Sequence, residues 1–230
     1  MRVYQLIYLF GEAFLLYLLT GWVVWLSGRR GGDALLLATG ATYLFLLTMS
    51  QVLAVRLLDI SPFMVPGGVL SYSASVAVLD IASVKYGARL GRWLVIIGAV
   101  LQLSYFIMLN LVSATPGTGG DGALSTSARI AVASVVAFLI SENIDVHLVT
   151  RLRLGVVRRV GVSDPIAMTI DSLVFIPTAF LGVLPTGVLL SLIIGQLIVK
   201  FSFVPLTMLT VGMNRKILGY GPMKTPTLSK

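Results

Sequence analysis

Several residue types are absent or scarce in this chain, and each scarcity narrows what the protein can be. There is no cysteine among its 230 residues, which excludes disulfides, iron–sulfur clusters and thiolate metal sites. The one histidine, His147, disfavours a bis-histidine haem. The sequence holds no histidine–glutamate metal motif, no Gly-x-Ser-x-Gly nucleophile turn and no nucleotide-binding loop. We therefore expect no metal site, no cofactor and no enzymatic activity.

Charged residues are also scarce. They make up 11% of the chain, against about 25% in soluble domains, while 57% of the residues are hydrophobic and the mean hydropathy is +0.97. This composition predicts an all-α integral membrane protein in one domain, residues 1–230, with about seven spans of roughly 20 residues each. The net charge is +8, but no basic stripe interleaves with aromatics, so we expect no nucleic-acid partner.

Seven apolar segments predict membrane helices. They cover residues 4–26, 34–55, 68–84, 90–112, 130–150, 163–184 and 187–211. The first lacks a basic start followed by a small-residue cleavage site, which favours a retained helix over a signal peptide. The sixth is expected to open at Ser163-Asp164-Pro165, because a Ser or Asp cap before proline is a helix-start signal.

The connecting segments carry turn residues. Pro62 and Pro66 interrupt the chain before the third helix, and residues 63–65 are candidates for a re-entrant or interfacial segment. The Thr- and Gly-rich stretch 115–122 predicts an exposed loop. The tail, residues 212–230, is expected on the cytoplasmic side, with its last part, from 219, mobile.

Positive charge predicts the orientation in the membrane. Taking alternate loops, 13 Lys and Arg residues fall on one side, 3 on the other, and Lys200 lies inside the last helix. The larger set comprises Arg29, Arg30, Lys85, Arg89, Arg92, Arg151, Arg153, Arg158, Arg159, Arg215, Lys216, Lys224 and Lys230. The smaller set comprises Arg2, Arg56 and Arg129. The positive-inside rule then places the N-terminus outside and the C-terminus in the cytoplasm of a cell-membrane protein, provided that the short third segment spans.

Polar residues inside the apolar spans are the candidates for function. Each charge near the bilayer centre costs about 2.5–3.5 kcal/mol on insertion scales, so its presence needs a reason. Such side chains face the bundle interior or a water-filled cavity and pair there. The candidate substrate-binding residues are Asp80, Glu142, Asp145, Asp171, Gln196 and Lys200. Any one of them alone could be structural, solvated near a helix end or paired with a loop arginine.

The spacing of these candidates predicts two shared helix faces. Glu142 and Asp145 are three residues apart and Gln196 and Lys200 four apart, so each pair projects to one side of its helix. Together they could line a pocket in which a carboxylate accepts the two adjacent N–H groups of a guanine-like edge. The residues alone do not distinguish a purine analogue from an amine, an ion or a vitamin. His147 fits a helix-end residue better than a proton carrier, and Glu12 fits a packing role.

Four motifs, in order along the chain, give a resemblance to a known family. They are LDIASVKYGARLGR from Leu79, ARIAVASVVAFLISENIDVHLVTRLR from Ala128, SDPIAMTIDSLVFIPTAF from Ser163 and GQLIVKFSFVPL from Gly195. The second is the most specific, with an acidic residue before Val-His at the helix end. Over residues 36–216 the chain resembles the queuosine-precursor transporters, a group of vitamin-uptake-transporter-like membrane proteins.

The resemblance implies uptake of 7-deazaguanine bases, the precursors of queuosine or archaeosine in transfer RNA. It also implies a six-helix core, residues 34–211, akin to the substrate-binding components of energy-coupling-factor transporters, with helix 4–26 additional. Asp80, Asp145, Asp171 and Lys200 match the family's polar positions. Val84 stands where the family often has an acid. The alternatives to a transporter that works by itself are a substrate-binding subunit that needs an ATP-driven partner, a membrane enzyme, and a ligand-free helix bundle.

Overall fold

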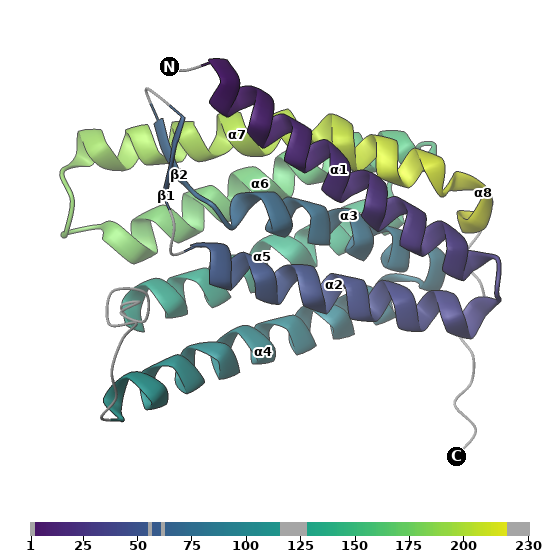
Figure 1. Cartoon of the computed structure of the whole chain (residues 1–230), viewed down its shortest axis with the longest axis horizontal. Coiled ribbons are helices and arrows are strands. Elements are labelled where there is room, and N and C mark those ends of the chain that lie inside the picture. The colour runs from purple at the N-terminus through teal and green to yellow at the C-terminus, as the bar shows by residue number, and fades with distance from the viewer. Residues whose placement is uncertain (1–2, 55–56, 61–62, 116–127, 220–230) are drawn as a thin grey trace.

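The computed structural model describes residues 3–54, 57–60, 63–115 and 128–219, and within them the chain forms a bundle of long helices. The long helices are α1 (Val3–Gly28), α2 (Gly32–Ala54), α3 (Val69–Tyr86), α4 (Ala88–Ala114), α5 (Ala128–Arg151), α6 (Val156–Phe180) and α7 (Thr186–Met213). They run along the length of the molecule, and consecutive helices alternate in direction (Figure 1). A short helix, α8 (Arg215–Leu218), follows α7. The all-α membrane bundle predicted from composition is confirmed.

Six of these helices are long and apolar enough to cross a membrane, namely α1, α2, α4, α5, α6 and α7. Their outer surfaces carry large apolar side chains that the bundle leaves exposed, among them Leu37, Phe45, Val100 and Met108. A contiguous apolar exterior on a helix bundle is suited to lipid. The protein is therefore a multi-pass membrane protein.

The third helix, α3, lies at the centre of the bundle and contacts all six apolar helices. It is not among the six candidate spans, and nearly all of its residues are buried among the other helices. Along its length Ser73, Ala74, Ala77 and Ala82 are fully buried, and small side chains of this kind let neighbouring helices approach closely. In Figure 1 it runs beside the other helices through the bundle. The predicted third helix, 68–84, is therefore present, ending two residues later than expected.

Two short strands precede α3. Strand β1 (Leu57–Ile60) pairs antiparallel with β2 (Phe63–Pro66). This hairpin occupies the segment that the sequence analysis considered re-entrant or interfacial, and it was not predicted. Most of the expected loop at 115–122 and of the tail beyond 219 lies outside the described residues.

The start of the sixth helix was predicted wrongly. Helix α6 begins at Val156, seven residues before the expected cap at Ser163. Both Ser163 and Asp164 are fully buried inside the helix, and Pro165 lies within it. Membrane helices accommodate internal proline because neighbouring helices compensate for the lost backbone hydrogen bond. The Ser-Asp-Pro signal therefore marks an interior position of a helix.

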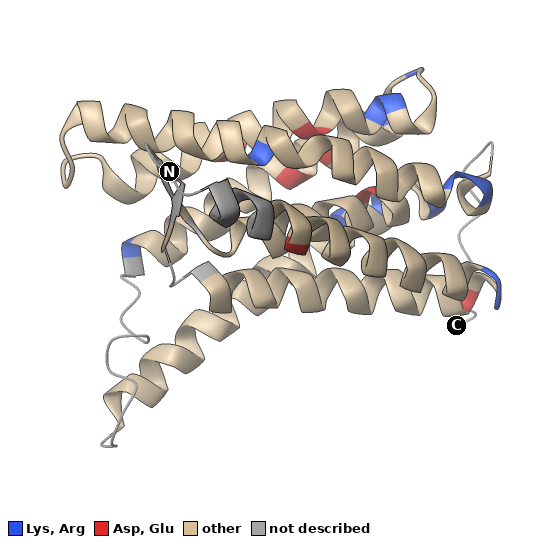
Figure 2. Cartoon of the chain, turned by 45° about the horizontal axis from the view of Figure 1, so that its top comes forward, with Lys and Arg blue, Asp and Glu red and all other residues tan. Residues whose placement is uncertain are grey.

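Lys and Arg residues lie mainly at one end of the bundle (Figure 2). This end holds the C-terminal ends of α1, α3, α5 and α7 and the N-terminal ends of α2, α4 and α6 (Figure 1). Gly87, at φ 91°, makes the tight connection from α3 to α4 here. The hydroxyl of Tyr86 donates to the Gly32 carbonyl at 2.7 Å, and the Lys85 ammonium donates to the Ile217 carbonyl. Because α3 runs from one end of the bundle to the other, Lys85 near its C-terminal end lies at the same end as the arginines of the connecting loops. The predicted orientation assumed this location for Lys85.

Candidate functional site

A charged pair between α6 and α7 lies inside the bundle. The Lys200 ammonium contacts a carboxylate oxygen of Asp171 at 2.5 Å, and their side chains are 5% and 13% exposed. Lys200 also donates to the Ser172 hydroxyl at 3.3 Å, and Ser172 donates to the Gln196 side-chain oxygen at 3.3 Å. We call Asp171, Ser172, Gln196 and Lys200 the Lys200 group. Within the part of the chain that the structure describes, Lys200–Asp171 is the one side-chain ion pair.

The Lys200 group continues toward α3 and α5 through an aromatic residue. The Lys200 ammonium lies 5.6 Å from the centre of the Tyr72 ring, a cation–π distance. The Tyr72 hydroxyl donates to one carboxylate oxygen of Glu142 at 2.5 Å. The other Glu142 oxygen, Oε2, is buried and has no hydrogen-bond partner among the described residues. Residues from α3, α5, α6 and α7 thus make one polar assembly.

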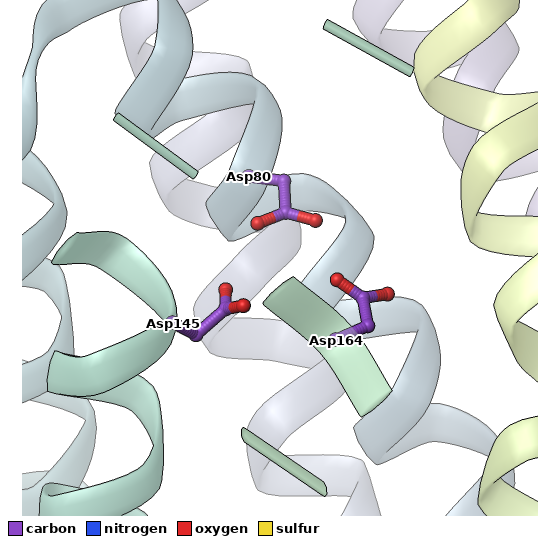
Figure 3. A group of neighbouring side chains, drawn as sticks. All are labelled: Asp80, Asp145 and Asp164. Carbon is purple, nitrogen blue, oxygen red and sulfur yellow. The ribbon is translucent and has the colours of Figure 1, made fainter. Parts of the chain in front are cut away.

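Three further carboxylates meet nearby. Asp80 on α3, Asp145 on α5 and Asp164 on α6 each place an oxygen within 4.8 Å of the other two, and all three residues are fully buried. Their carboxylates face a common centre in Figure 3. We call these residues the aspartate triad.

The six residues singled out from the sequence thus fall into two places. Asp171, Gln196 and Lys200 form the Lys200 group, with Glu142 joined to it through Tyr72. Asp80 and Asp145 belong to the aspartate triad. Glu142 and Asp145 connect the two places, since they lie three residues apart on one face of α5.

Sequence reasoning missed two members of this arrangement, Asp164 and Ser172. Asp164 was interpreted as a helix cap, although it lies seven residues before Asp171, a spacing that puts both on one helix face. Tyr72 is one of several aromatic residues expected to pack, to anchor the bundle at the membrane interface or, in one case, to stack on a planar ligand. Ser172 was not singled out. A serine hydroxyl is tolerated in an apolar helix, so Ser172 does not stand out in the sequence. Only the tertiary contacts show that it belongs to the polar site.

Two other polar candidates lie apart from both places. Glu12 on α1 and His147 near the end of α5 are exposed on the surface of the bundle. The sequence analysis assigned neither of them to binding, and the structure gives no reason to change that.

Apolar helices that enclose paired and unpaired charges define a class, the polytopic membrane proteins with an intramembrane polar site. Comparison with known proteins then gives the family. Residues 66–213 match the family model described as "putative vitamin uptake transporter". This region contains α3 to α7, and with them every residue of the Lys200 group and the aspartate triad. The chain belongs to this family.

A curated relative adds a more particular likeness. The chain is 27% identical over 148 residues to a protein of Bacillus subtilis (strain 168) described as a "probable queuosine precursor transporter". The match covers 59% of this chain and 65% of the relative, so it leaves about a third of that protein unaligned. Helices α1 and α2 lie outside the family match. No solved structure matches the chain.

Proposed function

We propose that this protein imports a small planar heterocycle, a 7-deazaguanine base that serves as a precursor of queuosine or archaeosine. The family and the name of the Bacillus subtilis relative support a vitamin-type or queuosine-precursor transporter. The four motifs that resemble the queuosine-precursor transporters lie in α3 to α7, the part of the chain that builds the polar interior. The orientation proposed with this function places the basic end of the bundle in the cytoplasm.

The observation that carries the proposal is the unpartnered, buried Oε2 of Glu142 beside the Lys200 group. A buried carboxylate oxygen without a donor is costly, and a guanine-like edge offers two adjacent N–H donors to such a carboxylate. Lys200 can donate to the carbonyl oxygen of the same base. The Tyr72 ring, next to both, can stack on its face.

The other residues of the site have proposed roles in the same scheme. Asp171 holds the Lys200 ammonium when no base is bound and balances its charge. Gln196, which accepts from Ser172, adds a contact to the ligand when that bond opens. Asp145 lies about one turn from Glu142 on α5, and Asp80 meets Asp145 from α3, so both act on the ligand through Glu142. Alternating access then moves the bound base from one membrane face to the other.

The direct test is uptake of a labelled 7-deazaguanine base into proteoliposomes that contain the purified protein. Glu142→Gln keeps the shape of the side chain and an acceptor for Tyr72 but replaces the free carboxylate oxygen by an amide. Losing a hydrogen bond to a charged group costs about 1.5–3 kcal/mol. We therefore expect the KM for uptake to rise about 10- to 100-fold.

The matched control is Glu12→Gln, the same replacement at an exposed position of α1, which should leave uptake unchanged. Wild-type uptake in Glu142→Gln would remove Glu142 from the site. Binding of the base without uptake by the purified protein, with uptake restored only by an ATP-hydrolysing partner, would instead favour the substrate-binding subunit. Neither binding nor uptake of any 7-deazaguanine base, with or without such a partner, would refute the proposed ligand class.

A further inference from the structure

The aspartate triad places three buried carboxyl groups together, and within the described ranges of the chain no cationic side chain lies beside them. None of its six carboxylate oxygens has a hydrogen-bond partner among the described residues, and the buried cation Lys200 is paired with Asp171 instead. Transferring one ionised carboxylate to the protein interior costs several kcal/mol, and three at close range also repel one another. Either protons on the carboxyl groups or a cation bound between them offsets this cost.

A fourth oxygen adjoins the triad. The Ser163 hydroxyl is fully buried and lies beside the Asp145 carboxylate, within reach of it, although no hydrogen bond of regular geometry forms. Ser163 precedes Asp164 on α6, so this helix brings a neutral oxygen and a carboxylate to the same place. Four unpartnered side-chain oxygen groups from three helices thus converge in a region that bulk water does not reach.

The chemistry of these groups selects the type of ligand. Carboxylate and hydroxyl oxygens are ligands of hard cations, whereas zinc and copper sites favour histidine nitrogen or thiolate sulfur. The three oxygens lie within 4.8 Å of one another, so a hard cation can fit between them. Magnesium gives up its water reluctantly and usually keeps several water ligands, so a buried site of this kind favours the larger ions, with longer oxygen distances such as the roughly 2.3–2.6 Å of calcium. The three carboxylates, which can each bind through one or two oxygens, and the Ser163 hydroxyl would supply most of the oxygen ligands of such an ion.

We propose that Asp80, Asp145 and Asp164, with the Ser163 hydroxyl, form a binding site for a hard cation of the size of Na⁺ or Ca²⁺. The sequence analysis predicted no metal site, since its residues are spread over 85 positions of sequence on three helices and match no local motif. The proposal concerns binding alone and stands whether or not the transported ligand is a 7-deazaguanine.

Its consequence for transport rests on the proposed function. A cation bound to the triad joins α3, α5 and α6, and the same three helices supply Tyr72, Glu142 and Asp171 to the ligand site. A bound cation would therefore fix the relative positions of these residues and raise affinity for the ligand, and ligand binding would raise affinity for the cation to the same extent.

The test measures cation binding without any transport substrate. Purified protein is freed of metal with a chelator and its melting temperature is followed against Na⁺, Ca²⁺, Mg²⁺ and K⁺, with N-methylglucamine holding ionic strength constant. A cation that binds only the folded state stabilises it by mass action. We expect a saturable rise with Na⁺ or Ca²⁺ and little with Mg²⁺ or N-methylglucamine. Equilibrium binding of the radioactive ion should give one site per chain.

Variants separate binding from folding. Asp164→Asn removes one of the three like charges, so the protein should melt at the same or a higher temperature without cation and lose the cation-induced rise. Ser163→Ala keeps all three carboxylates and should weaken cation binding several-fold. Asp33→Asn makes the same chemical change at an exposed position of α2 and should keep the full response.

Two outcomes would overturn the proposal. One is an unchanged cation response in both Asp164→Asn and Ser163→Ala. The other is no saturable response or ion binding in the wild-type protein, with stabilisation by acidification alone, which would mean that protons neutralise the triad. Because no 7-deazaguanine is present, neither outcome bears on the proposed transport function.

Discussion

Lys200 shows how a single charged residue persists in an apolar membrane helix. Its ammonium is 5% exposed and is held by Asp171, the Ser172 hydroxyl and the face of Tyr72. Asp171 and Ser172 come from α6 and Tyr72 from α3, so two neighbouring helices supply the contacts of the charge. A buried ion pair of this kind adds little stability over an apolar pair, but it becomes costly when one partner is removed.

This asymmetry gives a prediction for the pair. Asp171→Leu leaves the Lys200 cation buried without its carboxylate, and we expect a loss of about 3–5 kcal/mol of stability, seen as a lower melting temperature in detergent. The double variant Asp171→Leu/Lys200→Met should recover most of that loss, because two apolar groups replace both charges. Uptake of the labelled base should stay abolished in the double variant.

The comparison of the two readouts separates structure from function. Recovery of stability without recovery of uptake assigns Lys200 and Asp171 to ligand handling. Recovery of both would show that the pair serves folding alone, and would remove it from the proposed site.

At the scale of the helices, close packing around α3 positions both polar groups. The position of Gly91 on α4 shows how tight this packing is. A Cβ atom there would lie 2.3 Å from the Ser83 hydroxyl oxygen and 2.9 Å from a methyl group of Val146. Ser83 and Val146 are one turn or less from Asp80 and Asp145, so α4 supports the two helices that carry two members of the aspartate triad.

We expect Gly91→Val to force α4 away from α3 and α5. Overpacking of a well-packed interior costs about 1–3 kcal/mol, which should lower the melting temperature and weaken the response to cation. Gly11→Ala is the control, since a Cβ at Gly11 meets no atom within 4 Å and alanine favours helix. An unchanged melting temperature in Gly91→Val would show that α4 is not held against α3 as the structure has it.

For the whole molecule, the alternating direction of the helices and the location of the basic residues determine the proposed orientation. Arg153, in the α5–α6 connection, lies at the basic end, and Val183, in the α6–α7 connection, lies at the opposite end. Both are exposed. Because the chain has no cysteine, a single introduced cysteine can be labelled with a thiol reagent without background from other thiols of the protein.

We expect Val183→Cys to react with a membrane-impermeant maleimide on intact cells, and Arg153→Cys to react only after the cells are permeabilised. This pattern follows from the positive-inside rule, which retains the basic end in the cytoplasm. The measurement is the labelled fraction of each variant by gel shift. The reversed pattern would invert the proposed topology and, with it, the side from which the ligand enters.

Sequence alone determined the class of structure. A helix surrounded by lipid must be long and apolar, and this requirement can be recognised in each segment of the sequence by itself. Residues 187–211 and 90–112 were predicted as helices for that reason, and α7 and α4 contain them. The sequence also identified the buried charges, since Asp80 and Lys200 stand out in apolar surroundings.

Only the tertiary structure decided which charges meet. Asp145 and Asp164 are joined across a connection of a few residues, and Asp80 arrives from α3, 65 residues before Asp145. The same Ser-Asp-Pro sequence can cap a helix or lie inside one, and the choice depends on whether neighbouring helices bury it. Contacts between distant segments made Asp164 a partner of Asp80 and paired Lys200 with Asp171, and no local pattern encodes such contacts.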